Sequence, residues 1–204
     1  MDLDDYLARH AGQDDVLERI DRETKAMPMA AMQTSPDQAA LLTLLVRLTG
    51  AKTAVEIGTF TGYGAICIAR GLPEDGQLTI LEVSEEYAAI ARRNLDAAGV
   101  GDKATIRLGP AAEGLAALDT VDFAYVDADK DGYPAYYDAL VPKLRPGGVL
   151  LLDNMLRGGR VLDPQDDSTR ITDALNARIA ADERVDSFLL GVRDGLMIVT
   201  PRAA

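Results

Sequence analysis

Strand-length apolar runs alternate with helix-forming segments through most of the chain. Five such runs occur between positions 53 and 153, and they are TAVEIG (53–58), LTILEV (78–83), ATIRL (104–108), VDFAYVD (121–127) and VLLLD (149–153). Runs that are apolar on both faces and are separated by helices are typical of a parallel sheet covered on both sides. The pattern therefore predicts a doubly wound, Rossmann-like α/β fold.

The segments around these runs carry helix and turn signals. SPDQAALLTLLVRLTG opens with Ser35 and Pro36, and SEEYAAIARRNLDAAG opens with Ser84, in the positions typical of helix starts. A third helix is expected to begin near Tyr133, and a fourth to start at 168 or 169 and to run to about 182. The runs SFLLGV and LMIVT, joined by RDG, predict an antiparallel hairpin that closes one sheet edge.

Composition limits the domain count and the class of partner. The 204 residues, 48% of them apolar and 26% charged, suit one domain, with N-terminal helices over 1–50 and a Rossmann-like core over 51–204. A formal net charge of −12 disfavours nucleic acid and membrane surfaces, so a small-molecule partner is expected. Without a long apolar run or a signal-like N-terminus, a cytoplasmic protein is expected. Cys67, the single cysteine, lies in an apolar helical run and should be buried.

The glycine-rich stretch EIGTFTGYG (56–64) follows the first run, where α/β folds place a ligand loop. Its glycines, which include Gly58 and Gly64, do not fit the GxGxxG spacing of dinucleotide sites, and Glu56 would repel a pyrophosphate. Glu82 ends the second run, from which an acidic residue can bind ribose hydroxyls. Together these residues predict a site for a positively charged adenosine ligand such as S-adenosylmethionine. The alternative is a plain tight turn beside a solvated strand end.

Oxygen-bearing side chains end two later runs. Asp127 ends VDFAYVD, and Asp153 and Asn154 follow VLLL, so the three converge if those strands are neighbours. This set suits Mg²⁺, Mn²⁺ or Ca²⁺ rather than zinc. An aromatic diol could chelate such an ion through both oxygens, and Lys130 could take the proton if its own pKa were depressed. The alternative is a group of turn residues, with Lys130 paired to a neighbouring aspartate at the surface.

In these motifs the chain resembles the cation-dependent class I O-methyltransferases of the caffeoyl-coenzyme A and catechol type. The segments that carry the resemblance, in the order and spacing of that family, are EIGTFTGYG, LPEDGQLTILEVSEE, VDADKDGY and LLDNMLRGGRV. The resemblance covers roughly position 32 to the C-terminus. It implies a seven-stranded sheet with a reversed last strand, which agrees with the expected hairpin, and it implies a homodimer.

The resemblance also implies roles for single residues. Asp127, Asp153 and Asn154 would hold the metal, Lys130 would be the candidate base, and Asp127 would also lie near the substrate. The S-adenosylmethionine site would comprise Thr34, Glu56, Gly58, Thr59, Gly64, Glu82, Asp127 and the backbone of Ala111.

Two places depart from the family pattern. Gly64 stands where the family usually has Ser, so backbone or water would replace one hydrogen bond to the methionine carboxylate. In the loop of about fifteen residues after Asn154, a length often found in binding loops, Arg157 and Gly158 stand where plant-type members have Trp and Asn. Arg157 is either a solvated loop charge or a ligand for an acidic substituent on the acceptor.

The combined prediction is a divalent-metal-dependent and S-adenosylmethionine-dependent O-methylation of a vicinal aromatic diol. Two alternatives stay open. One is an NAD(P)-dependent reductase on the same architecture, which the missing GxGxxG and Glu56 disfavour. The other is a methyltransferase-like protein that binds the cofactor without catalysis.

Overall fold

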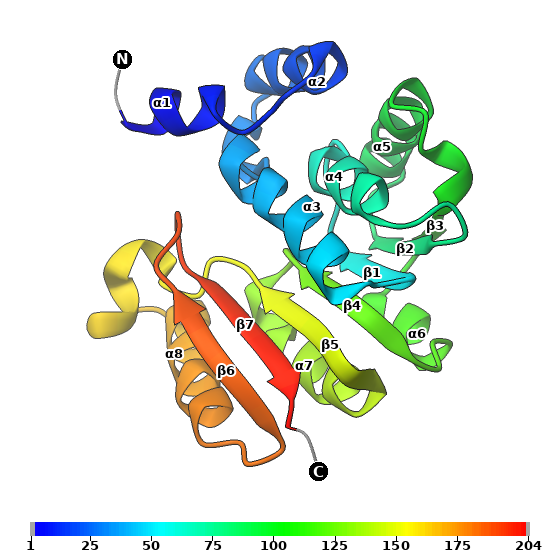
Figure 1. The fold of residues 1–204 in the computed structure, drawn as a ribbon. Coiled ribbons are helices and arrows are strands. Elements are labelled where there is room, and N and C mark those ends of the chain that lie inside the picture. The colour runs from blue at the N-terminus through cyan, green and yellow to red at the C-terminus, as the bar shows by residue number, and fades with distance from the viewer. Residues whose placement is uncertain (1–2, 203–204) are drawn as a thin grey trace.

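The computed structural model describes residues 3–202, which form a seven-stranded sheet flanked by helices (Figure 1). The strands lie in the order β3-β2-β1-β4-β5-β7-β6. β7 runs antiparallel to both β5 and β6, and the other pairings are parallel, so the predicted fold with a reversed last strand is confirmed. The strands are β1 Thr53–Ile57, β2 Gln77–Glu82, β3 Ala104–Leu108, β4 Val121–Val126, β5 Leu144–Leu152, β6 Val185–Leu190 and β7 Leu196–Pro201.

All the apolar runs become strands, and most of their ends agree with prediction to within two residues. β5 is the exception, because it begins at Leu144 rather than at position 149. The added residues read LRPGG, and the register with β4 shifts between Val121 and Phe123 opposite them. A search for apolar runs misses this part of the strand because proline and glycine interrupt it.

Helices connect the strands, and the described part of the N-terminal fifty residues is helical as predicted. Gly50 ends α3 with a φ of 63°, and Ser84 caps α5 by accepting from the backbone N–H of Tyr87. Asp166 caps α8, which therefore starts slightly earlier than expected. The helices are α1 Leu3–Arg9, α2 Asp15–Lys25, α3 Pro36–Thr49, α4 Tyr63–Gly71, α5 Glu85–Ala97, α6 Ala111–Ala116, α7 Tyr133–Leu140 and α8 Asp167–Ala180.

Helices cover both faces of the sheet (Figure 1). The core on one face is shared with α3, α4 and α5, and the core on the other with α6, α7 and α8. Successive side chains of β4 alternate between them, so Phe123 and Tyr125 join the first core while Ala124 and Val126 join the second. Cys67 lies in the first core, as predicted, and burial raises the pKa of its thiol to about 11.

The N-terminal helices are part of this packing. Leu17 and Ile20 of α2 are buried in the core that contains α3 and α4. Thr24 of α2 donates a hydrogen bond to the Thr61 hydroxyl of the glycine-rich loop at 3.1 Å. The segment before the sheet is thus tied to the loop where a ligand was predicted. Within residues 3–202, no helix combines the length and the apolar character needed to cross a membrane.

Candidate active site

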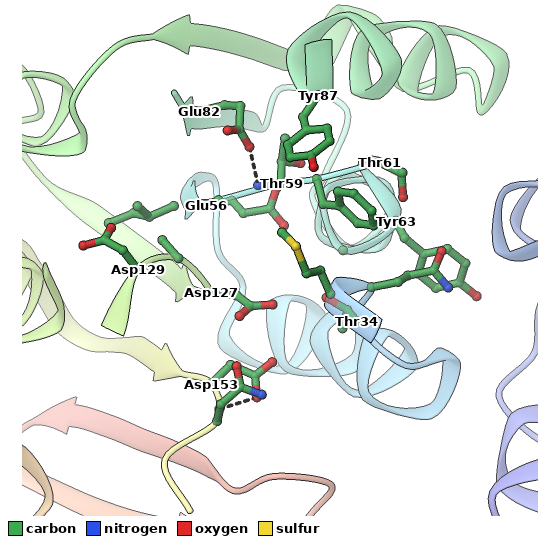
Figure 2. A pocket seen from close by; sticks show the side chains of 18 of the residues that line it. Thr34, Glu56, Thr59, Thr61, Tyr63, Glu82, Tyr87, Asp127, Asp129 and Asp153 are labelled. Carbon is green, nitrogen blue, oxygen red and sulfur yellow. Dashed lines mark hydrogen bonds between the residues drawn. The ribbon is translucent and has the colours of Figure 1, made fainter. Parts of the chain in front are cut away.

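A cavity of about 720 Å³ opens where β1, β2, β4 and β5 end (Figure 2). Because these four strands are parallel, their carboxyl ends share one edge, and the residues that follow them meet there. Every predicted cofactor, metal and base residue lines this cavity, whereas Arg157, the predicted substrate residue, is not among its lining residues. The predicted residues that line it are Thr34, Glu56, Gly58, Thr59, Gly64, Glu82, Ala111, Asp127, Lys130, Asp153 and Asn154.

Gly58 allows the loop after β1 to pack against the chain that leaves β4. Its φ is 79°, and a Cβ atom there would lie 2.3 Å from the backbone oxygen of Asp127. The backbone N–H of Gly58 donates to Leu81 at 3.0 Å, and that of Asp127 donates to Ile57 at 2.9 Å. Only glycine combines this conformation with so close an approach, so Gly58 allows the end of β1 to lie against the end of β4.

Glu82 is held by the backbone around it. Its Oε2 accepts a hydrogen bond from the N–H of Thr59 at 3.1 Å, which Figure 2 shows as a dashed line. Its Oε1 accepts from the N–H groups of Val83 and Ser84, both at 2.9 Å. These three donors fix the buried carboxylate at the strand end, and its remaining lone pairs can accept from ligand hydroxyls.

Glu56 is more deeply buried than Glu82, with 1% of the residue exposed against 6%. Burial raises the pKa of its carboxyl to about 8, and the charges of Asp127 and Glu82 act in the same direction. Gly64 lies against it: a Cβ atom at Gly64 would be 2.9 Å from Glu56 Oε1 and 3.3 Å from Thr34 Oγ1. A positive group in the cavity would favour the ionised form of Glu56, which fits the predicted cationic ligand.

Asp127 and Asp153 project from the ends of β4 and β5 into the same part of the cavity (Figure 2). Burial, followed by the charge of Asp153, raises the pKa of Asp127 to about 6, against the opposing effect of Lys130. Lys130 Nζ donates to Asp127 Oδ1 at 3.2 Å and to the Tyr133 hydroxyl at 2.6 Å. The Tyr133 hydroxyl in turn donates to the carbonyl oxygen of Val126 at 3.0 Å. These contacts hold the Lys130 ammonium group beside Asp127.

Asp153 is 4% exposed and has partners from other elements. Its Oδ2 accepts hydrogen bonds from Gln38 Nε2 at 2.5 Å and from the Tyr125 hydroxyl at 2.6 Å. Its Oδ1 accepts from the backbone N–H of Asn154 at 2.7 Å. Asn154 has a φ of 57°, in the left-handed region, which asparagine enters more readily than most residues.

The donor set at these strand ends fits a divalent cation. Two carboxylates that repel one another, with an amide beside them, suit a hard ion that binds oxygen. Within the described residues no three His, Cys, Asp or Glu side chains are grouped to hold a metal. A cation at Asp127 and Asp153 would therefore also need the amide oxygen of Asn154 and oxygens from water or the acceptor, which Mg²⁺ accommodates.

Comparison with known proteins identifies the family. A family model described as O-methyltransferase matches residues 8–202. The chain belongs to this family. It is a class I S-adenosylmethionine-dependent O-methyltransferase of the caffeoyl-CoA and catechol type.

Individual relatives of this methyltransferase agree. The catechol O-methyltransferase of Niastella koreensis is 35% identical over 196 residues, which cover 92% of this chain and 89% of that one. Caffeoyl-CoA O-methyltransferase 2 of Zea mays is 38% identical over 193 residues, which cover 86% and 72% of the two chains. The crystal structure of an O-methyltransferase from Bacillus cereus in complex with SAH has a TM-score of 0.90 at 33% identity, and the match covers 98% and 97% of the two chains.

Sequence reasoning missed several residues that line the methyltransferase cavity. Gln38 lies in the first turn of α3, and its contact with Asp153 spans 115 positions of the sequence. Phe60 and Tyr87 pack edge to face, with ring centroids 4.9 Å apart. The sequence predicted a helix start around Gln38, a turn around Phe60 and a helix around Tyr87. It did not signal which side chains would face the cavity.

The turn between β6 and β7 was predicted as a turn but not as part of the site. Arg193 and Asp194 of this turn line the cavity. Arg193 has a φ of 49°, and its Nε donates to both carboxylate oxygens of Asp37 at 3.0 Å. The backbone oxygen of Asp194 accepts from the N–H of Leu156 at 2.8 Å, and that of Gly195 accepts from Met155 at 2.9 Å. The turn thus connects the start of α3 with the loop that follows Asn154.

Arg157 lies beside the start of α8. It opens the 3₁₀ segment Arg157–Leu162 with a φ of 53°. Its Nη2 donates to the hydroxyl of Ser168 at 3.3 Å. A contact between Arg157 and the acceptor therefore stays a prediction that depends on how far a bound acceptor extends from the cavity.

Proposed function

We propose that this methyltransferase methylates one hydroxyl of a vicinal aromatic diol and that a divalent cation, Mg²⁺ or else Mn²⁺ or Ca²⁺, takes part. Asp127, Asp153 and Asn154 would hold the cation. The observation that carries the proposal is that two carboxylates, one of them paired with Lys130, line the cavity that also contains Glu82. The relatives named as catechol and caffeoyl-CoA O-methyltransferases support an aromatic acceptor.

The cofactor half of the cavity lies at the ends of β1 and β2. Glu82 would accept hydrogen bonds from the ribose hydroxyls, and Glu56 would face the positive charge of the methionine part. The absence of a side chain at Gly64 leaves the neighbouring backbone and water to contact the methionine carboxylate. The other residues proposed to bind S-adenosylmethionine are Thr34, Gly58, Thr59, Asp127 and, through its backbone, Ala111.

The diol half of the cavity would perform the transfer. A bound divalent cation would hold both diol oxygens and lower the pKa of the reacting hydroxyl. The acceptor oxygen attacks the methyl carbon, the carbon–sulfur bond breaks, and the sulfonium becomes a neutral thioether. Lys130, which contacts with Asp127 and Tyr133 hold in place, would take the hydroxyl proton once its own Nζ had released one.

Removal of the metal tests this proposal. EDTA is expected to abolish methylation of a catechol panel, Mg²⁺ is expected to restore it, and Asp127→Ala is expected to stay inactive at any Mg²⁺ concentration. Undiminished turnover in chelator would refute the metal part.

Membership of the O-methyltransferase family excludes the reductase alternative. The same panel of catechols tests the other alternative, a methyltransferase-like protein without catalysis. Tight cofactor binding without turnover on any diol would favour a cofactor-binding protein that does not catalyse.

The role of Arg157 is the part of the proposal that concerns acceptor choice. Its guanidinium would bind an acidic substituent on the ring, because such a group is a favourable partner for arginine. Methylation of a carboxylated and of a neutral catechol is compared in the wild type and in Arg157→Ala. A selective loss with the carboxylated substrate supports the role, and an equal loss with both substrates contradicts it.

The family resemblance also implies a homodimer, which we include in the proposal. Leu44 and Leu48 of α3 are 52% and 72% exposed, which is consistent with a surface that a second copy covers. Light scattering on a size-exclusion column should give twice the mass of one chain. A single-chain mass across the micromolar range would contradict the dimer.

A further inference from the structure

Gln38 is a buried polar residue that no predicted role explains. It lies in the first turn of α3 and is 2% exposed, so its amide must find partners inside the protein. Its Nε2 donates to Asp153 Oδ2 at 2.5 Å and to the Tyr125 hydroxyl oxygen at 3.2 Å. The amide therefore joins the N-terminal helices to the end of β5.

The two oxygens of Asp153 have different surroundings. Oδ2 receives two side-chain donors, from Gln38 and from Tyr125, whereas Oδ1 receives one backbone donor, from Asn154. Amide N–H and hydroxyl groups that point at one carboxylate oxygen hold the group in a single orientation. They leave Oδ1 as the oxygen with more lone-pair capacity to spare.

The arrangement assigns Gln38 a role in the reaction of this enzyme. We propose that Gln38, together with Tyr125, is a positioning residue that orients Asp153 for cation binding, so that α3 sets the metal affinity without contacting the metal. The inference rests on the divalent-cation part of the proposed function. Outer partners of metal ligands usually change metal affinity about 10–100-fold when they are removed.

Gln38→Met tests the inference, because methionine has a similar length but no N–H donor. Mn²⁺ binding is measured by electron paramagnetic resonance on protein saturated with S-adenosylhomocysteine (SAH). The Kd for Mn²⁺ is expected to rise about 10–100-fold. The Kd for SAH, measured by calorimetry, should stay within about twofold, because the network meets the cofactor half only at the 3.3 Å contact between the Tyr125 hydroxyl and Thr34. Saturating Mn²⁺ should restore most of the turnover, which a folding defect would prevent.

Gln13→Met is the matched control. Gln13 Nε2 also donates to a tyrosine hydroxyl at 2.5 Å, but this is the hydroxyl of Tyr63, and Asp153 is not its partner. The same chemical change at this position should leave the Kd for Mn²⁺ unaltered. Equal weakening in both variants would overturn the inference, because it would show a general effect of losing an amide that donates to a tyrosine hydroxyl.

Tyr125→Phe keeps the test decisive if Gln38→Met does not fold. It removes the second donor to Asp153 Oδ2 while the ring stays in the core. A Kd for Mn²⁺ that stays at the wild-type value in either folded variant overturns the positioning role alone. Failure of the wild-type protein to bind Mn²⁺ would instead refute the metal part of the proposed function, and the inference with it.

Discussion

The two halves of the cavity hold their acidic groups in different ways. At the end of β2, Glu82 accepts three hydrogen bonds from backbone N–H groups of the adjoining loops. At the end of β5, Asp153 accepts side-chain hydrogen bonds from Gln38 of α3 and Tyr125 of β4. Local backbone therefore shapes the cofactor half, whereas contacts between distant side chains shape the diol half.

The charge balance differs as well. Asp127 and Asp153 face one another, and burial with this repulsion raises the pKa of Asp127 to about 6. Such a pair gains from a cation between the two groups, because each carboxylate is less stable while the other is ionised. In the cofactor half the backbone fixes Glu82, and the repulsion there acts on the buried Glu56, where a cationic ligand would relieve it. In the diol half the repulsion is between Asp127 and Asp153, where a bound metal ion would relieve it.

Removal of one carboxylate from the diol half should have the largest effect. Asp153→Asn is expected to lower kcat/KM for a catechol by about 10³-fold or more, because the metal loses a charged ligand and the diol its orientation. The Kd for SAH, measured by calorimetry, should change less than about threefold, because the backbone donors that fix Glu82 do not contact Asp153. A parallel loss of SAH binding would show that the halves are not independent.

Glu82→Gln probes the cofactor half. An amide at this position loses charge-assisted hydrogen bonds worth about 1.5–3 kcal/mol, so the Kd for SAH should rise about 10–100-fold. Mn²⁺ binding should stay unchanged. Glu85→Gln, on the exposed first turn of α5, is the control and should bind SAH normally. A larger effect on Mn²⁺ than on SAH would reverse the assignment of the halves.

Glu56 should make the stability of the ligand-free protein depend on pH. Its pKa is about 8 in the folded protein, against 4.5 as the ordinary value. Between these values the folded state holds a proton that the unfolded state has lost. Stability should therefore fall as pH rises through this window, by at most ~1.4 kcal/mol per pH unit.

Urea unfolding at pH 6 and pH 8 measures this contribution. Glu56→Gln cannot ionise, so the difference between the two pH values should shrink in that variant. An unchanged difference would mean that other groups carry the pH dependence. Bound S-adenosylmethionine should also reduce the difference, because its positive charge favours ionised Glu56.

The smallest expected effect concerns the turn that joins the diol half to α3. Arg193→Gly loses the ion pair with Asp37 but relieves a positive φ, so the free energy of unfolding should change by less than about 1 kcal/mol. Asp37→Asn loses the pair without that relief and should be the more destabilising of the two. Chemical denaturation compares them, and the opposite order would mean that the backbone of Arg193 is not strained.

Much of the cofactor half could be predicted from sequence because several of its residues are close together in the chain. Glu56, Gly58 and Gly64 lie between the end of β1 and the start of α4, and Glu82 is the last residue of β2. The approach of Asp127 to Asp153 followed from parallel strands, on the single condition that β4 and β5 are neighbours. The pattern of apolar runs gives the strand ends, and the strand ends give the positions of these residues.

The supports of the diol half could not be predicted in this way. The contacts of Gln38 with Asp153 and of Asp37 with Arg193 join positions more than a hundred residues apart. No local pattern specifies which residue of a helix start will face a distant strand end. The positive φ of Arg193 was also not predictable, because glycine and asparagine are the residues that usually indicate this conformation.

The tip of the hairpin between β6 and β7 has a consequence for how acceptor preference can change. The tip contributes Arg193 and Asp194 to the cavity, and it holds the loop after Asn154 through backbone hydrogen bonds. It joins two strands at the edge of the sheet, away from the ends of β1 and β2. Residues 191–195, which join β6 to β7, can therefore be exchanged as a unit, in a library or during divergence, while the cofactor half stays intact.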